Sequence, residues 1–199
     1  MKQFSVVVVD DHTLLSQAIQ AMVDTFDNFK VLYTCKNGQD LVEQFSISEN
    51  IPNVVLMDVN MPIMNGLETT EWIKENHSDV HVMALSVEDE DTTVLKMLKA
   101  GAVGYLLKDT EKSVLEKALI EIVENGFYHT KNVTNLLMKS ISGSFKNEIN
   151  LKQKEINFLK LACTELTYKE IANEMCLSPK TIDGYRNALF TQLNVKNRV

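Results

Sequence analysis

Five short apolar runs, separated by amphipathic segments, constrain the fold of this chain more than any other feature of its sequence. The runs lie at residues 4–9, 29–34, 54–57, 80–85 and 104–107. Their length and their richness in valine and leucine are typical of strands that are buried on both faces. The intervening segments carry apolar residues at helical spacing, for example Leu14, Ala18 and Met22. This strict alternation predicts an α/β fold with a doubly wound, five-stranded parallel sheet.

The strand pattern stops near residue 125, and the rest of the chain has a helical pattern. Asn125-Gly126 is a typical helix stop. One more helix is expected near 130–141, followed by small polar residues at 142–147 that favour a flexible linker. We therefore expect a first domain at 1–125, a helix and linker at 126–150, and a smaller all-α domain at 151–199. A chain of 199 residues is long enough to bury two such cores.

Charge is unevenly distributed along the chain, whose net charge is -7. Residues 1–150 carry 12 Lys+Arg and 22 Asp+Glu, a net of -10, whereas residues 151–199 carry 8 and 5, a net of +3. Only the C-terminal part therefore suits a polyanion such as DNA. The sequence has no run of 18 apolar residues and no signal-peptide pattern, so we expect a cytoplasmic protein without a membrane partner. Cys35, Cys163 and Cys176 form no CxxC pair, and we expect neither a disulfide framework nor a zinc site.

Polar residues follow four of the five expected strands. Asp10 and Asp11 follow the first, Asp58 the third, Ser86 the fourth and Lys108 the fifth. Because the carboxyl ends of parallel strands meet at one edge of a sheet, we expect these side chains to lie together. Three neighbouring carboxylates suit a Mg²⁺ ion, and the lysine and hydroxyl suit phosphate oxygens. Taken singly, the acids or the serine could instead cap helices, and the lysine could be a solvated surface charge.

Four motifs at these strand ends resemble the receiver domains of response regulators. They are Val-Val-Asp-Asp-His at 8–12, Met-Asp-Val-Asn-Met-Pro-Ile-Met-Asn-Gly at 57–66, Ala-Leu-Ser at 84–86 and Gly-Tyr-Leu-Leu-Lys-Asp at 104–109. The resemblance covers residue 4 to about residue 125. It implies a flavodoxin-like fold and a signalling function that depends on phosphorylation.

The resemblance also implies a role for each residue of the pocket. It makes Asp58 the nucleophile that accepts a phosphoryl group from a sensor histidine kinase. The expected Mg²⁺ ligands are Asp11, Asp58, the main-chain carbonyl of Asn60 and, through water, Asp10. Lys108 would steady the transferred group by charge neutralisation. In the family, the hydroxyl at Ser86 and the ring at Tyr105 then move, which alters the face formed by the fourth helix, the fifth strand and the fifth helix.

Two residues near the pocket need a separate interpretation. Val87 departs from the family, in which Ala or Gly usually follows the switch hydroxyl, and its branched side chain is expected to crowd the pocket. His12 lies beside the acidic pair. We expect it to begin the first helix, because imidazole is a poor ligand for Mg²⁺.

The C-terminal segment carries a second set of motifs. They are Leu151-Lys-Gln-Lys-Glu-Ile, Thr167-Tyr-Lys-Glu-Ile-Ala, Leu177-Ser-Pro-Lys-Thr-Ile and Leu193-Asn-Val-Lys-Asn-Arg-Val. These motifs resemble the LuxR/NarL-type helix-turn-helix domain, with its two helices expected at 168–175 and 179–193 and Ser178 as the cap of the second. Compared with the family, the last helix of the domain is expected to be incomplete at Val199.

Helix periodicity divides the expected recognition helix into two faces. Ile182, Ala188 or Leu189, and Leu193 should face the core. The candidates for DNA binding are Lys180, Thr181, Asp183, Gly184, Arg186 and Asn187. We expect phosphate contacts from Lys180, Thr181 and Arg186, and base contacts from Asn187 with Asp183 as a second candidate. Because the family more often has a basic residue in the place of Asp183, the base specificity of relatives does not transfer to this chain.

Together the two domains resemble a two-component response regulator of the NarL/FixJ type, which binds DNA as a homodimer and is not an enzyme. Two other functions remain open. A Mg²⁺-dependent phosphohydrolase could use Asp58 as a covalent nucleophile, although Asn60 takes the place of its general acid. A phosphorelay or other protein-interaction regulator would combine the same receiver with a helical domain that does not bind DNA.

Overall fold

The computed structural model describes residues 3–141, 152–164 and 166–192. The chain divides into two compact units, Met1–Ser142 and Gly143–Val199, and each has its own hydrophobic core. Among the described residues, every helix is too short or too polar to cross a membrane.

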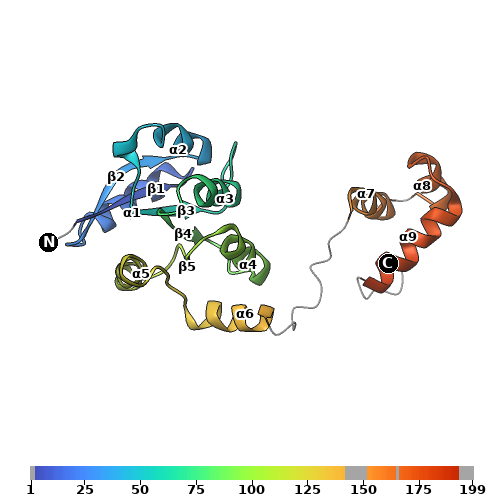
Figure 1. The fold of residues 1–199 in the computed structure, drawn as a ribbon. Coiled ribbons are helices and arrows are strands. Elements are labelled where there is room, and N and C mark those ends of the chain that lie inside the picture. The colour runs from blue at the N-terminus through green and yellow to red at the C-terminus, as the bar shows by residue number, and fades with distance from the viewer. Residues whose placement is uncertain (1–2, 142–151, 165, 193–199) are drawn as a thin grey trace. The chain divides into compact units, whose positions relative to one another are not determined.

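The first unit is a parallel sheet covered by helices (Figure 1). Its elements are β1 (Phe4–Val9), α1 (Thr13–Val23), β2 (Phe29–Cys35), α2 (Gly38–Gln44), a 3₁₀ turn (Ser48–Asn50), β3 (Val54–Asp58), α3 (Gly66–Asn76), β4 (His81–Ser86), α4 (Asp91–Ala100), β5 (Gly104–Leu107), α5 (Lys112–Asn125) and α6 (Lys131–Ile141). The strands pair in the order β2-β1-β3-β4-β5, and every pair is parallel. This arrangement confirms the predicted doubly wound sheet.

The observed strands differ from the predicted ones by a residue at some ends. β3 extends to Asp58, which pairs with Leu85 of β4. β4 extends to Ser86, which pairs with Leu107 of β5. Both side chains therefore belong to the last position of a central strand, where each residue is still paired with one neighbouring strand. The sheet thus fixes the position of these two polar groups.

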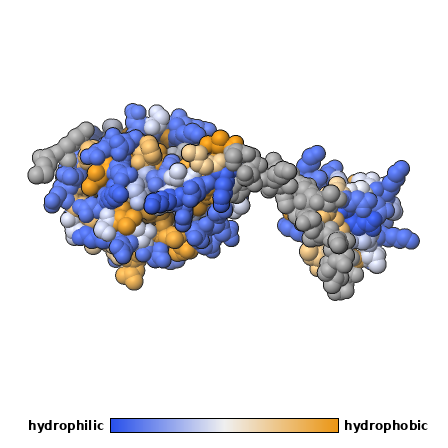
Figure 2. Space-filling view, turned by 90° about the horizontal axis from the view of Figure 1, so that it is seen from below, coloured by the Kyte–Doolittle hydropathy of each residue, from blue (hydrophilic) through white to orange (hydrophobic). Residues whose placement is uncertain are grey.

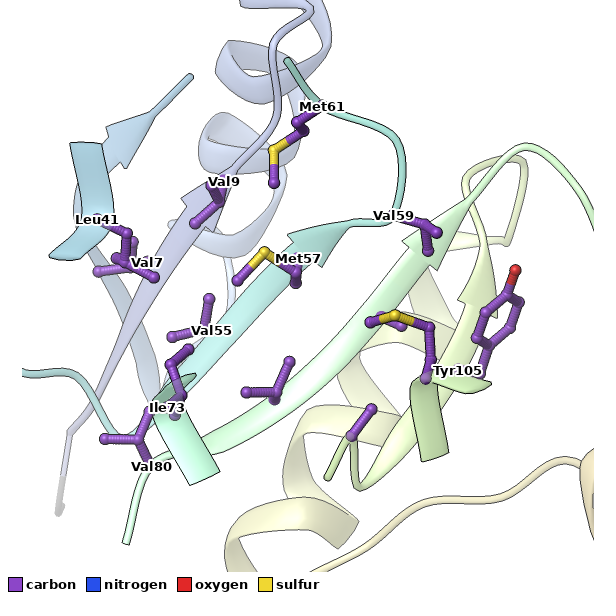
Figure 3. Packing of buried hydrophobic residues seen from close by; sticks show 14 of the residues in the cluster. Val7, Val9, Leu41, Val55, Met57, Val59, Met61, Ile73, Val80 and Tyr105 are labelled. Atoms are coloured by element: carbon purple, nitrogen blue, oxygen red, sulfur yellow. The ribbon is translucent and has the colours of Figure 1, made fainter. Parts of the chain in front are cut away.

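Residues along each strand point alternately to the two faces of the sheet. One face packs against α2, α3, α4 and α6, and its strand residues include Val7, Val9, Val55 and Met57. The other face packs against α1 and α5, and its strand residues include Val6, Val8, Val54 and Leu56. All eight side chains are fully buried. Figure 3 shows the first of these two layers, in which side chains of β1 and β3 lie close to Leu41 and Ile73.

Helix α6 packs against the rest of the first unit. Val133 and Leu136 are buried in the same cluster as Tyr105 of β5. The segment before α6 extends the edge of the sheet, because the N–H of Tyr128 donates to the carbonyl of Val103 at 3.0 Å. The predicted helix near 130–141 is therefore confirmed, and it lies against the surface formed by α4 and β5.

The second unit consists of three described helices, α7 (Gln153–Ala162), α8 (Tyr168–Glu174) and α9 (Pro179–Gln192). Its core is formed by Phe158, Ala162, Ile171, Ala172, Ile182 and Leu189. Ser178 caps α9, since its Oγ accepts a hydrogen bond from the N–H of Thr181 at 3.1 Å. Of the two alternatives for the core, Leu189 is buried and Ala188 is exposed, while Leu193 lies outside the described residues. On the visible face of each unit hydrophilic side chains predominate (Figure 2).

Candidate functional site

The sheet brings the predicted pocket residues to one edge. Asp10 and Asp11 follow β1, Asp58 and Ser86 end β3 and β4, and Lys108 follows β5. Three of these polar side chains are buried, with relative exposures of 2% for Asp10, 5% for Asp58 and 1% for Ser86. Burial of so many polar groups in one place requires mutual contacts or a bound ion.

The ammonium group of Lys108 bridges two carboxylates. Its Nζ lies 2.7 Å from Asp10 Oδ2 and 3.0 Å from Asp58 Oδ2. The Lys108 side chain is only 8% exposed, so it is not a solvated surface charge. Burial raises the pKa of the Asp58 carboxyl, and the hydrogen bond and positive charge of Lys108 oppose this rise. The pocket therefore holds a carboxylate and a cation in direct contact at the end of the central strand.

The acidic cluster of the pocket fits a small hard cation. Oxygen or nitrogen atoms of Asp10, Asp11, His12 and Asp58 all lie within 4.8 Å of one another. Asp10 Oδ2 and Asp11 Oδ1 are buried and accept no well-aligned hydrogen bond from the described residues, although Lys108 Nζ lies 2.7 Å from the first and His12 Nδ1 lies 2.8 Å from the second. A divalent ion with oxygen ligands would satisfy both atoms.

His12 contributes to this cluster from the start of α1. It is the N-cap residue of the helix, and its side chain makes no capping hydrogen bond. Its N–H donates to Asp10 Oδ1 at 2.8 Å, and its Nδ1 lies 2.8 Å from Asp11 Oδ1. The histidine side chain is 70% exposed. The expectation that His12 begins the first helix is confirmed.

The two predicted switch residues lie next to each other in the structure. Ser86 Oγ accepts a hydrogen bond from the N–H of Glu88 at 3.1 Å, and the N-cap position of α4 is Glu90, so the serine does not cap that helix. Tyr105 is buried, and its hydroxyl donates to the carbonyl of Glu88 at 2.7 Å. Burial raises the pKa of Tyr105, and a hydrogen bond with Ser86 opposes the rise. The loop after β4 is thus joined to both residues.

The sequence pattern missed the requirement for a glycine at the start of α3. Gly66 N–H donates to the carbonyl of Val59 at 3.0 Å, and a Cβ at this position would collide with the carbonyl of Asp58. Gly66 therefore allows the N-terminus of α3 to approach the backbone of the central strand. The Asn-Gly pair at 65–66 was the available signal in the sequence.

A second feature that the sequence did not reveal is a cavity of about 400 Å³ beside Asp11 and Asn60. Its other wall is formed by Thr93, Lys96 and Met97 of α4. The side chain of Asn60 is exposed, and its N–H donates a long hydrogen bond of 3.4 Å to Asp58 Oδ1. A small molecule could therefore reach the acidic pocket through this cavity, which lies between the pocket and α4.

Val87 lies in the loop after β4, and it is 73% exposed. A side chain with this exposure is directed to solvent. If the size of this side chain affects the rate of phosphorylation, it therefore does so by controlling access to the pocket.

Four of the candidate DNA contacts form a stripe on the exposed face of α9. The stripe comprises Lys180, Asp183, Gly184 and Asn187. These positions are three or four residues apart, which places them on one side of the helix. Thr181 is also exposed, and its hydroxyl is 2.8 Å from Ser178 Oγ. Arg186 is half-buried at the edge of the stripe. All six candidate DNA contacts are thus at least partly accessible on this helix.

Both parts of the sequence match known families. Residues 6–120 match the family described as response regulator receiver domain. Residues 150–199 match the family described as bacterial regulatory proteins, luxR family.

Similar proteins and structures match along nearly the whole chain. The response regulator GacA of Pseudomonas protegens is 32% identical over 196 residues, which cover 98% of this chain and 91% of that protein. The nitrate/nitrite response regulator protein homolog of Haemophilus influenzae is 29% identical and covers 99% and 93%. The structure of response regulator ChrA of a heme-sensing two-component system has a TM-score of 0.60 at 27% identity and covers 100% and 94%. The RcsB–DNA complex has a TM-score of 0.66 at 21% identity and covers 98% and 94%, a likeness of fold alone.

Proposed function

Because this chain belongs to the two-component response regulators that join a receiver domain to a LuxR-family DNA-binding domain, we propose that phosphorylation of Asp58 controls its binding to DNA. The chain is a transcriptional regulator by family. The observation that carries the assignment of Asp58 is its place at the buried end of central strand β3, 3.0 Å from the Nζ of Lys108.

The proposed reaction transfers a phosphoryl group from a phosphohistidine of a sensor histidine kinase to Asp58. A carboxylate oxygen of Asp58 attacks the phosphorus, a P–O bond forms, the P–N bond breaks, and the imidazole leaves with the electron pair. Lys108 neutralises charge on the transferred oxygens, and its contacts with two carboxylates already hold its ammonium group in place. Burial limits the access of water to the acceptor, which slows hydrolysis of the acyl phosphate.

The acidic cluster is the proposed site for Mg²⁺. The ligands would be Asp11, Asp58, the main-chain carbonyl of Asn60 and, through water, Asp10. The buried acidic oxygens without hydrogen bonds support this assignment. When bound, the ion supplies positive charge that offsets the repulsion between carboxylates and phosphoryl oxygens. His12 takes no part in metal binding, since hard cations prefer oxygen ligands.

The proposed signal runs from the pocket to the surface formed by α4 and β5. Ser86 and Tyr105 both contact the Glu88 segment, so a movement of the Ser86 hydroxyl toward a phosphoryl group changes the surroundings of Tyr105. Tyr105 shares a hydrophobic cluster with Val133 and Leu136 of α6. A change at the pocket would therefore alter how α6 packs, and α6 leads toward the DNA-binding domain.

The DNA-binding surface is proposed to be the exposed face of α9 in the major groove. The luxR-family match and the net charge of +3 in residues 151–199 support this assignment. Lys180 and Thr181 near the start of the helix suit phosphate contacts, and Asn187 suits a base edge. We propose that two copies bind DNA together when phosphorylated, and that the protein acts in the cytoplasm, where bacterial DNA lies.

Hydrolysis of phosphate esters is not proposed as a function. A phosphohydrolase with Asp58 as nucleophile requires a general acid for its leaving group. The place two residues after Asp58 is occupied by Asn60, whose amide does not donate a proton in this way. A leaving group would therefore have no acid to protonate it at this position.

Labelling with acetyl phosphate tests the assignment of the acceptor. The wild-type chain with Mg²⁺ should gain about 80 Da, the mass of one phosphoryl group, in an intact-mass measurement. Asp58→Asn should gain nothing, and EDTA should prevent labelling of the wild type. Asp79→Asn, which changes an exposed aspartate outside the pocket, serves as the matched control and should label normally. Retained labelling of Asp58→Asn would refute the assignment, and sustained hydrolysis of p-nitrophenyl phosphate would favour the enzyme.

A further inference from the structure

The only acidic residue of α9 lies in the middle of its exposed stripe. Asp183 is exposed, with Lys180 one turn before it and Asn187 one turn after it. A carboxylate in this position is repelled by the phosphates of DNA, which lowers affinity. A residue that only faced solvent would give no benefit to offset this loss. The position of Asp183 is therefore informative about what the helix contacts.

Arg186 forms an ion pair with the Asp183 carboxylate. Its Nη1 lies 3.2 Å from Asp183 Oδ1. Its Nε and Nη2 donate to Asn187 Oδ1 at 3.3 and 3.2 Å. The guanidinium also lies over the ring of Tyr168 in α8, 5.3 Å from the ring centroid. A planar guanidinium with contacts on three sides is held in one orientation, and it orients the polar groups that it contacts.

These contacts change the role of each partner. Asp183 offsets part of the charge of Arg186, which reduces the value of Arg186 as a phosphate contact. The ion pair engages one oxygen of Asp183, and a carboxylate has a second oxygen that accepts hydrogen bonds. Asp183 is thus a hydrogen-bond acceptor whose carboxylate is oriented by Arg186.

Gly184 gives independent support for a close contact at this point of the helix. A Cβ at Gly184 would meet no atom within 4 Å, and the residue has no positive φ. Neither packing nor backbone conformation of this unit therefore requires glycine, although glycine weakens a helix interior. The absence of a side chain is useful where another molecule approaches the helix backbone.

We propose that Asp183 reads the amino group of a cytosine in the major groove, and that Arg186 is the positioning residue that aims it. The proposal rests on the DNA-binding function proposed above. Cytosine presents its N4 amino donor in the major groove, whereas adenine presents an amino donor beside the N7 acceptor, which repels a carboxylate. Gly184 leaves room for the base edge or the adjoining backbone beside Asp183.

A selection experiment with the full chain tests this proposal. The protein is treated with acetyl phosphate and Mg²⁺ and is used to select duplexes from a randomised pool. Affinities are then measured for the selected duplex, for single-base variants of it and for an unrelated duplex, at several salt concentrations. The variants are Asp183→Ala, Arg186→Ala and Arg186→Lys. Glu174→Gln, which removes a negative charge from an exposed residue of α8, is the matched control.

The wild type should require cytosine at one position of each half-site, with a loss of about 5- to 150-fold for other bases there. Asp183→Ala should reduce this preference to less than about 2-fold and leave the other positions intact. Its affinity for the unrelated duplex should rise, and its slope of log affinity against log salt should steepen by about one, because the charge of Arg186 becomes available to a phosphate. Glu174→Gln should change neither the base preference nor the slope.

The two arginine variants separate positioning from phosphate binding. Lysine keeps the charge of arginine but not its planar fork. Arg186→Lys should therefore lose the cytosine preference as fully as Arg186→Ala does. Retention of that preference in Arg186→Lys, or in Asp183→Ala, would overturn the proposal while DNA binding itself stands. A wild type without sequence-dependent or salt-dependent DNA binding would contradict the proposed function, and this inference with it.

Discussion

Replacing Gly184 with alanine should make the second unit more stable and its DNA binding weaker. Alanine is about 1 kcal/mol more favourable than glycine in a helix interior. The added methyl group meets no atom within 4 Å, so no steric cost offsets this gain. For a unit of this size, about 1 kcal/mol corresponds to a rise in Tm of roughly 4–8 °C.

The same methyl group should hinder the approach of DNA to α9. Disturbing one base contact typically costs about 1 kcal/mol or more, so affinity for a selected duplex should fall by at least about 5-fold. A loss of binding in a protein that is more stable cannot result from misfolding. The two effects together therefore identify Gly184 as a contact point.

Two spectroscopic signals resolve the stability of the units in the full chain. Trp72 is the single tryptophan and belongs to α3, so its fluorescence follows the first unit, whereas far-UV circular dichroism follows both. Asn173→Ala is the matched control, because it improves helix propensity at an exposed position of α8 by about 0.5 kcal/mol. The control should raise stability without a change in affinity. A fall in the Tm of Gly184→Ala, or unchanged DNA affinity, would refute the reasoning.

Three further predictions concern single residues. Val87→Ala should speed both gain and loss of the phosphoryl label, because a smaller side chain widens access to the pocket; equal rates would show that Val87 does not control entry. Cys176 has a φ of +51°, so Cys176→Gly should relieve about 1 kcal/mol of backbone strain and raise the urea midpoint of the second unit; a lower midpoint would contradict this. Burial lowers the pKa of His129 from its usual value of 6.5. The contribution of His129 to the free energy of unfolding should therefore be full above about pH 6.5 and decline below it, as the unfolded chain takes up a proton. In a pH titration of stability, His129→Gln should lack this decline.

The sequence predicted the sheet and the pocket well, for a physical reason. Buried parallel strands require continuous apolar runs, and the polar residues that follow them lie at one edge whatever the details of the helices. Asp10, Asp58 and Lys108 could therefore be placed together before their distances were known. The roles of these residues, and the domain limits at 1–125, 126–150 and 151–199, stay predictions.

Contacts between distant segments could not be predicted from local patterns. The packing of Val133 and Leu136 beside Tyr105 depends on where α6 meets the sheet. The orientation of Arg186 depends on Tyr168, which lies in a different helix. Periodicity identifies which face of a helix is buried, but it does not identify the partner on that face. For this reason the sequence suggested a phosphate contact for Arg186, whereas its observed neighbours suggest a positioning role.

The link between phosphorylation of Asp58 and DNA binding is the central claim. Full-length wild type and Asp58→Asn are incubated with sheared genomic DNA, with and without acetyl phosphate and Mg²⁺, and the retained fragments are sequenced. Acetyl phosphate should change the set and amount of retained fragments for the wild type and should have no effect for Asp58→Asn. An equal response of the two proteins, or no response of a wild type that is shown by mass to be phosphorylated, would contradict the account.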